Sequence, residues 1–132
     1  MSIRVGIDLV AVATVAESMT GPHGELYLAR VYTSAERRDC TGPDGPDPSR
    51  LAARFAAKEA TLKVLATPSE GIAWTTMEVV RDTDGFVRVA LHGRASELAA
   101  AAGIRSLALS LSHEAGLAAA VVVATIDDAP SR

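Results

Sequence analysis

The chain has few aromatic residues, one cysteine and no strong excess of charge of either sign. Only 4% of its 132 residues are aromatic, whereas 48% are hydrophobic. The core must therefore be built from alanine, valine, leucine and isoleucine. A core of such small side chains leaves apolar surface that an oligomer could bury.

The scarcity of cysteine and of positive charge excludes several classes of protein. With Cys40 as its one cysteine, the chain has no internal disulfide framework, which is typical of a reducing cytosol. Nothing nearby in the sequence would activate this thiol, so we expect it to be incidental. The net charge of −3 gives no global basic patch, so nucleic acid is not an expected partner. Any site for an anion must be local.

Long hydrophobic runs are absent as well. The first residues, Met-Ser-Ile-Arg-Val, do not provide a charged region followed by a long apolar stretch, so we expect no signal peptide. The longest apolar run, residues 116–124, is shorter than the roughly 20 residues that a membrane-spanning helix needs. We interpret it as a buried strand. These features predict a cytoplasmic protein without a membrane partner.

The apolar periodicity predicts one α+β domain over residues 1–126 and a flexible tail over 127–132. Strands are expected at residues 3–10, 75–81, 87–92, 107–113 and 117–126. Helices are expected at residues 10–19, 24–31, 50–65 and 95–102. Because strands and helices do not alternate regularly, a doubly wound parallel sheet is not expected.

Local signals support these elements. Residues 33–36, Thr-Ser-Ala-Glu, have capping-box spacing and predict a further helix start. The turn at residues 82–85, Asp-Thr-Asp-Gly, predicts a hairpin. Residues 41–48 are rich in proline and glycine and are expected to form a loop, after which Ser49 can cap the longest helix.

The longest helix carries the clearest chemical signal, Arg-Phe-Ala-Ala-Lys-Glu-Ala-Thr-Leu-Lys at residues 54–63. Glu59 and Lys63 are one helical turn apart and share a face. An acid and several cations on a helix otherwise made of alanine and core residues could hold a metal and a polyphosphate together. Taken singly, Glu59–Lys63 also fits a surface ion pair worth about 0.3–0.5 kcal/mol. Arg54 and Lys58, taken singly, are more often solvated helix residues than phosphate ligands.

Two further segments place polar side chains at the ends of strands. Asp8 ends Gly-Ile-Asp on the opposite side of its strand from the neighbouring apolar residues, where a carboxylate can point into a cleft. His113 ends Ser-Leu-Ser-His on the alternating strand 107–113. Each residue also has an ordinary alternative: Asp8 could bond to a turn, and His113 could be a satisfied core histidine.

Together, in this order and at these separations, the three segments resemble the holo-acyl-carrier-protein synthase family, the small single-unit phosphopantetheinyl transferases. The resemblance extends from Val5 to Val123 and includes residues 27–36 and 74–79. It implies a 4′-phosphopantetheinyl transferase-like fold, with a mixed or antiparallel sheet and a long central helix. It also implies an enzyme that moves 4′-phosphopantetheine from coenzyme A to a serine of an apo acyl carrier protein of fatty-acid or polyketide type, releasing 3′,5′-ADP.

The resemblance implies a role for each site residue. Asp8 and Glu59 would hold Mg²⁺, which prefers carboxylate and phosphate oxygens. Glu59 is also the candidate base toward the serine, directly or through a water on the metal. Lys63 would stabilise or protonate the leaving phosphate, while Arg54 and His113 would hold the nucleotide phosphates. Asp8, Glu59, Lys63 and His113 form the implied catalytic set.

The surface for the carrier protein departs from the family pattern. Thr14, Tyr27 and Arg30 match positions near that surface, but family members often carry glutamate and then arginine where this chain has Ala11 and Thr14. Fewer arginines weaken docking to the acidic helix of a carrier protein. This favours a carrier protein other than the usual fatty-acid one, for instance from a polyketide pathway.

The family resemblance further implies a homotrimer with active sites between protomers. The alternative from another class is a non-catalytic homologue that binds coenzyme A or a carrier protein. Retention of the full catalytic set argues against that alternative. A structural subunit whose helix carries these charges by chance is the third interpretation.

Overall fold

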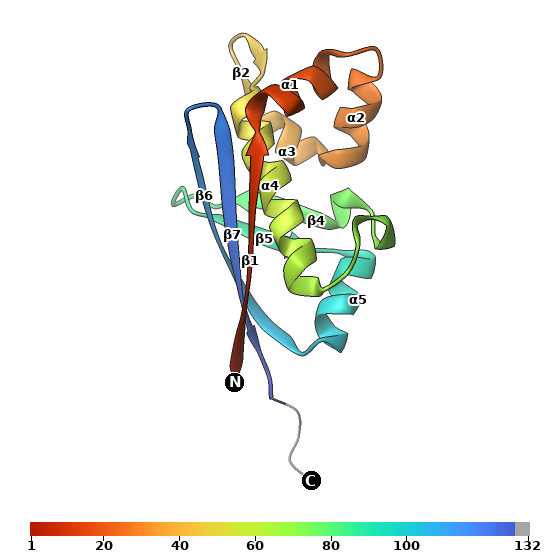
Figure 1. The fold of residues 1–132 in the computed structure, drawn as a ribbon, viewed down its shortest axis with the longest axis vertical. Helices are drawn as coiled ribbons and strands as arrows, with labels where there is room; N and C mark the ends of the chain where they lie inside the picture. The colour runs from red at the N-terminus through yellow and green to blue at the C-terminus, as the bar shows by residue number, and fades with distance from the viewer. Residues whose placement is uncertain (129–132) are drawn as a thin grey trace.

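A long helix lies across a three-stranded antiparallel sheet in the computed structural model, which describes residues 1–128 apart from the side chain of Ser69. The sheet has the order β1 (Ser2–Ala11), β7 (Leu117–Ile126), β6 (Ile104–Glu114). Helix α4 (Pro48–Leu65) packs on β1 and β7 (Figure 1). The predicted α+β class, antiparallel sheet and long central helix are confirmed.

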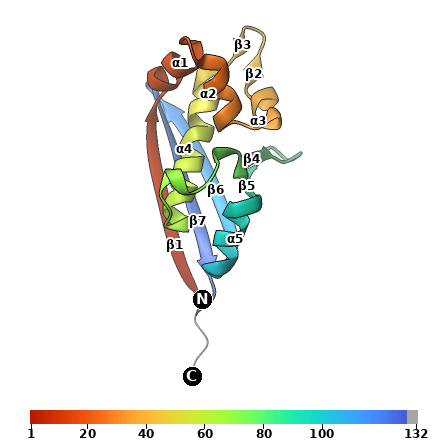
Figure 2. The same ribbon diagram turned by 90° about the vertical axis from the view of Figure 1, so that its right-hand side faces the viewer.

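The remaining elements lie on the same side of the sheet as α4 (Figure 2). One group, near the N-terminal end of α4, comprises α1 (Val12–Thr20), α2 (Gly24–Val31), α3 (Ser34–Asp39) and the short hairpin β2 (Thr41–Gly42)–β3 (Gly45–Pro46). The other group comprises the short 3-10 helices η1 (Ser69–Gly71) and η2 (Trp74–Thr76), the hairpin β4 (Met77–Arg81)–β5 (Val87–Leu91) and α5 (Gly93–Ala101). No helix among residues 1–128 is both long and apolar enough to cross a bilayer.

Several predicted element ends are corrected. The long helix begins at Pro48 rather than residue 50, and Asp47 rather than Ser49 caps it. The Asp47 carboxylate accepts a hydrogen bond of 2.9 Å from the Ser49 N–H. Proline, which has no N–H, is favoured at position 48 because an N–H in the first helical turn would have no partner within the helix. The helix ends where Ala66 adopts a left-handed φ of 54°. The predicted loop at residues 41–48 contains the β2–β3 hairpin.

The first two residues of the predicted tail make contacts with the folded domain. The Asp127 N–H donates to the Gly103 carbonyl at 2.9 Å, and the Asp127 carboxylate lies 3.2 Å from Arg105. The Asp128 carboxylate pairs with the terminal ammonium of Met1. The other predicted tail residues, 129–132, lie outside the described residues.

Small side chains let α4 approach the sheet closely. The helix residues Ala57 and Ala60 are fully buried, as are Ala118 and Ala124 on β7. At Gly6 on β1, an added Cβ would lie only 2.2 Å from the Ala60 carbonyl oxygen. The high alanine content is therefore a packing requirement of the helix–sheet contact.

Gly6→Ala is expected to push α4 away from β1. The new methyl group cannot share space with a backbone oxygen, so the variant should lose about 1–3 kcal/mol of unfolding free energy. Gly42→Ala is the matched control, since its Cβ would meet open space. Urea denaturation of both variants tests this; a Gly6→Ala protein as stable as the parent would contradict it.

Lys58 is buried, which corrects the expectation that it is solvated. Lys58 is 1% exposed, because α4 is covered by the sheet on one side and by β4 on another. The Lys58 ammonium lies 2.8 Å from the buried Glu36 carboxylate and donates to the carbonyls of Trp74 and Met77. Glu36 also accepts from the Val79 N–H at 2.8 Å. Lys58 therefore joins α3, α4 and β4 rather than serving a ligand.

The other face of the sheet carries no helix (Figure 2), and its β1 strand is apolar and exposed there. Ile3, Val5, Ile7 and Leu9 on β1 are 58–64% exposed. In the register, Val5 lies beside Val123 of β7, so the apolar side chains continue across strands. An exposed apolar surface of this kind marks an interaction site more often than a free surface.

Candidate active site

Asp8 and Lys63 meet where β1 passes beneath α4. The Lys63 ammonium lies 3.3 Å from Asp8 Oδ1 and donates to the Ile7 carbonyl at 2.6 Å. Gly6 makes this contact possible, because it lies two residues before Asp8 on the helix-facing side of the strand and lets α4 come close. Arg4, on the same side, donates to the Val64 carbonyl at 2.7 Å and fixes the end of α4.

Glu59 completes this group one turn before Lys63. Partial burial raises the pKa of its carboxyl group, the negative charge of Asp8 raises it further, and Lys63 acts in the opposite direction. Asp8 and Glu59 are thus close enough for their charges to interact. Lys63 pairs with Asp8 rather than with Glu59, so the simple surface ion pair within the helix is not what forms.

The group formed by Asp8, Glu59 and Lys63 can hold a hard divalent cation. Two carboxylates and the nearby Ile7 carbonyl offer oxygen atoms, the ligands that Mg²⁺ prefers. The Lys63 ammonium contacts two of these oxygens, the Ile7 carbonyl and Asp8 Oδ1, so the position suits a positive charge. Residues 1–128 contain no cluster of three or more histidine, cysteine or acidic side chains, so a cation here would need ligands from outside this group.

Neutralising Glu59 should stabilise the fold slightly. A carboxyl group with a raised pKa binds its proton more tightly in the folded state, so it reduces stability as pH rises through that pKa. We expect Glu59→Gln to be more stable than the parent at pH 7, by at most about 0.5 kcal/mol because solvent screens a half-exposed group. The difference should disappear near pH 4. Urea denaturation at both pH values measures it, and a variant less stable at pH 7 would contradict the proximity of the two carboxylates.

Arg54 does not join this group within one chain. It lies nine residues, about two and a half turns, before Lys63, so the two side chains leave α4 on opposite sides. Arg54 is only 2% exposed, which corrects the expectation of a solvated residue. Its Nε and Nη2 atoms are buried without a hydrogen-bond partner among the described residues. A buried, unpartnered guanidinium is expensive, which makes this side chain a candidate for an anion.

His113 is also separate from the Asp8 group. In the sheet register Asp8 lies beside Ala120, and Ala120 lies beside Leu111, so the strand of His113 is two positions across the sheet. The His113 side chain is exposed near the end of β6. It borders an open hollow of about 320 Å³ that is lined by Leu9, Ser112, His113, Glu114, Ala115, Leu117 and Ala119.

The predicted carrier-protein residues lie on α1 and α2. Thr14 and Arg30 are exposed, whereas Tyr27 is half-buried. The Tyr27 hydroxyl forms a 2.9 Å hydrogen bond with the hydroxyl of Tyr32, and the two rings meet edge to face. Tyr27 therefore also anchors α2 to the core, so only part of its side chain remains available to a partner.

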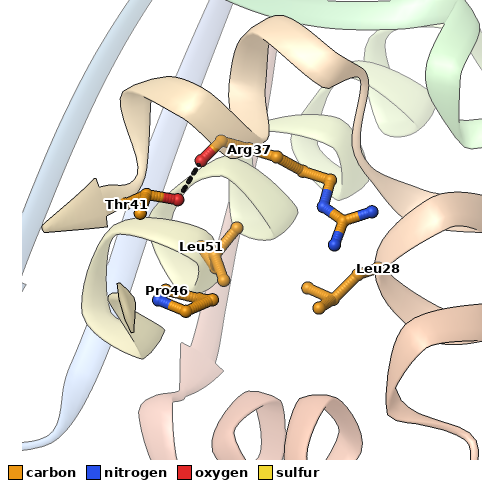
Figure 3. A pocket seen from close by; sticks show the side chains of 5 residues that line it. All are labelled: Leu28, Arg37, Thr41, Pro46 and Leu51. Atoms are coloured by element: carbon orange, nitrogen blue, oxygen red, sulfur yellow. Dashed lines mark hydrogen bonds between the residues drawn. The ribbon is translucent and has the colours of Figure 1, made fainter. Parts of the chain in front are cut away.

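A small pocket lies between α2, α3 and α4, lined by Leu28, Arg37, Thr41, Pro46 and Leu51 (Figure 3). Its volume is about 50 Å³, well below the roughly 300–1,000 Å³ of typical ligand pockets. Arg37 at its edge is bound to Glu25 by two hydrogen bonds, and its carbonyl accepts one from Thr41. This pocket is a packing gap rather than a ligand site.

One contributor to the site and one buried acidic residue of the core were not identified from the sequence. The carbonyl of Ile7 has no side-chain signature and emerges only from the fold. Glu36 was assigned only to a capping box, which it does form. The signal that could have revealed the role of Glu36 was Lys58, since a lysine that is buried within a helix needs an acidic partner. Cys40 is buried, which raises the pKa of its thiol to about 11 and leaves it unreactive.

Comparison with known proteins places this arrangement in a family. Residues 4–122 match the family model described as the 4′-phosphopantetheinyl transferase superfamily. A holo-[acyl-carrier-protein] synthase of Clavibacter michiganensis is 45% identical over 127 residues, covering 96% of this chain and 97% of the relative. A protein of the same name from Anaeromyxobacter dehalogenans is 41% identical over 125 residues, covering 93% and 95%.

Solved structures agree with the sequence relatives. The ACPS–CoA complex of Chronobacterium ammoniagenes has a TM-score of 0.84 and 29% identity, covering 97% of this chain and 100% of that one. A Helicobacter pylori holo-[acyl-carrier-protein] synthase in complex with coenzyme A has a TM-score of 0.79 and 27% identity, covering 92% and 100%. On this evidence the chain belongs to the 4′-phosphopantetheinyl transferase superfamily.

Proposed function

We propose that this protein transfers 4′-phosphopantetheine from coenzyme A to a serine of an apo acyl carrier protein, of fatty-acid or polyketide type, and releases 3′,5′-ADP. Its relatives carry the name of that activity, and related structures were solved with coenzyme A. The single observation that carries the proposal is the contact of Lys63 with Asp8 beneath α4, one helical turn from Glu59.

In this proposal Asp8 and Glu59 hold Mg²⁺. When bound, the ion supplies positive charge against the pyrophosphate of coenzyme A. Lys63 lies beside these carboxylates and carries a further positive charge for the phosphate that leaves. Its exposed side chain is long enough to turn from the strand toward a substrate.

Glu59 is the proposed base. The serine oxygen of the carrier protein attacks the phosphorus that bears the pantetheine arm, and the bond from that phosphorus to the 3′,5′-ADP oxygen breaks. The serine proton passes to Glu59, and the leaving phosphate carries the electron pair away. A raised carboxyl pKa suits this role, since a base works best when its pKa approaches the working pH.

Arg54 and His113 are proposed to hold the nucleotide phosphates from a different direction. Within one chain, both residues lie away from Asp8, Glu59 and Lys63. A site that contains all five residues therefore requires a second protomer. We propose a homotrimer in which His113 of one protomer faces Asp8, Glu59 and Lys63 of another. The apolar outer face of the sheet would form the contact between protomers.

Val5→Glu should break this assembly. Val5 is 58% exposed on the outer face of the sheet, where a buried charge would oppose association. We expect the parent to sediment as a trimer and Val5→Glu as a folded monomer with little activity. Phe86→Glu is the control, because Phe86 is 74% exposed in the turn between β4 and β5, outside the three-stranded sheet. Sedimentation of the parent as a stable, active monomer would contradict the shared site.

The carrier-protein surface is proposed to include Thr14, Tyr27 and Arg30. Thr14 is exposed and uncharged, at a position where the family resemblance implies arginine. A less acidic carrier protein than the usual fatty-acid one is therefore the proposed partner. We propose that the enzyme acts in the cytoplasm.

Release of 3′,5′-ADP tests the proposed reaction. Chromatography of a mixture of this protein, coenzyme A, Mg²⁺ and an apo carrier protein should show 3′,5′-ADP forming only when the carrier protein is present. Coenzyme A that is bound but never cleaved would support the non-catalytic alternative.

A further inference from the structure

Lys63 occupies the place where a cation is needed. Its ammonium contacts the carboxylate of Asp8 and the carbonyl of Ile7, at 3.3 and 2.6 Å. Both oxygens belong to the group that suits a hard divalent cation. The Lys63 ammonium thus contacts the oxygen atoms that a bound Mg²⁺ would use as ligands.

This contact is not forced by burial. The Lys63 side chain is 54% exposed, whereas that of Asp8 is 19% exposed. Lys63 could extend into solvent, and the strand and helix would remain joined by Gly6 packing and by the bond from Arg4 to Val64. An exposed ion pair of this kind is worth about 0–1 kcal/mol, so it can open at little cost.

The geometry points to Lys63 as a built-in competitor for the divalent cation: it neutralises Asp8 when the cation is absent and leaves Asp8 when the cation binds. The inference deepens the proposed function and rests on it. The released ammonium can then pair with a phosphate of coenzyme A. Cation and coenzyme A should therefore bind cooperatively, since each favours the same position of Lys63, and the coupling is reciprocal.

Mn²⁺ binding measured by electron paramagnetic resonance, without coenzyme A, tests the competition. Lys63→Met should bind Mn²⁺ about three- to fivefold more tightly than the parent, which is the range expected for loss of an exposed ion pair. Lys63→Arg keeps the charge and should bind within about twofold of the parent. Arg4→Gln removes a nearby charge without touching Asp8 and is the control for long-range electrostatics. Equal affinities for the parent and Lys63→Met, or equal tightening by Arg4→Gln, would overturn the inference.

Adding coenzyme A tests the coupling. Coenzyme A should tighten Mn²⁺ binding more in the parent than in Lys63→Met. An equal increase in both proteins would overturn the coupling. Asp8→Asn separates this inference from the metal site itself: if Asp8→Asn binds Mn²⁺ as tightly as the parent, the proposed metal site is wrong, whatever Lys63 does.

Lysine NMR follows the displacement directly. Lys58 and Lys63 are the only lysines in the sequence, and Lys58 is buried, so a lysine-labelled protein gives two side-chain signals that are easily assigned. Saturating Mg²⁺ should move the Lys63 signal toward that of a free lysine and leave the Lys58 signal unchanged. A Lys63 signal that stays in place while Mg²⁺ binds would overturn the inference.

Discussion

Asp8→Ala and Glu59→Ala are each expected to abolish transfer while leaving the protein folded. Each removes one of the two carboxylates proposed to hold Mg²⁺, and an ion of this kind is usually held by only one or two carboxylates. Loss of a preorganised electrostatic group at a reacting centre typically lowers kcat by about 100- to 1,000-fold, so we expect a decrease of at least that size.

Folding of these two variants is the necessary control. Both residues are only partly buried, and Glu59→Ala removes a carboxyl group whose raised pKa shows that its charge is disfavoured. Thermal unfolding should therefore remain close to that of the parent. If either variant keeps parental activity at saturating Mg²⁺, Asp8 and Glu59 are not the metal ligands.

The second large effect is expected at the buried Glu36–Lys58 pair. Lys58 donates to Glu36 and to two backbone carbonyls, and Glu36 accepts from two backbone N–H groups as well. Glu36→Ala leaves the Lys58 ammonium buried without its paired carboxylate, and Lys58→Ala leaves the Glu36 carboxylate buried without its paired ammonium. Removing one partner of a buried pair costs about 3–5 kcal/mol, a large part of the roughly 5–15 kcal/mol that stabilises a domain.

Urea denaturation at fixed protein concentration measures this loss. Glu36→Met combined with Lys58→Met should lose less stability than the two single variants added together, because no lone charge is left in the interior. Arg50→Ala is a matched control, since Arg50 is exposed and, among the described residues, bonds to the partly exposed Asp47 carboxylate and to the carbonyl of Asp39. Single variants that lose less than about 1 kcal/mol would show that water reaches the pair.

The elements with strong local signals could be predicted from the sequence. The capping box of Thr33 and Glu36 starts α3 as expected, and the segments 24–31 and 117–126 match α2 and β7. These signals depend on neighbours in the chain, so they need no knowledge of tertiary structure. The start of α4 was misplaced because Asp47 and Ser49 are both good caps, and only the fold shows which of them is used.

The burial of charged residues could not be predicted in the same way. Arg54 and Lys58 are usually surface residue types, and alanine-rich helices do not reveal which sides are covered. Here α4 is enclosed on several sides, so both residues are interior. The local packing at Gly6 likewise depends on Ala60, 54 positions later in the sequence.

Only some of the predicted site residues lie close together in the structure. Lys63 contacts Asp8 within one chain, and Glu59 is one helical turn before Lys63 on α4. Arg54 and His113 do not join them, because one lies on the far side of α4 and the other two strands across the sheet. Spacing along the sequence cannot distinguish a site built within one protomer from one shared between protomers.

Mass spectrometry of intact carrier proteins tests the central proposal most directly. Apo carrier proteins of fatty-acid and polyketide type are incubated with this protein, coenzyme A and Mg²⁺, and a carrier protein whose acceptor serine is replaced by alanine is the control. The proposal predicts that at least one intact carrier protein gains the mass of a single phosphopantetheine, and that Glu59→Ala prevents this gain. Carrier proteins that bind this protein and coenzyme A but keep their original mass would contradict it.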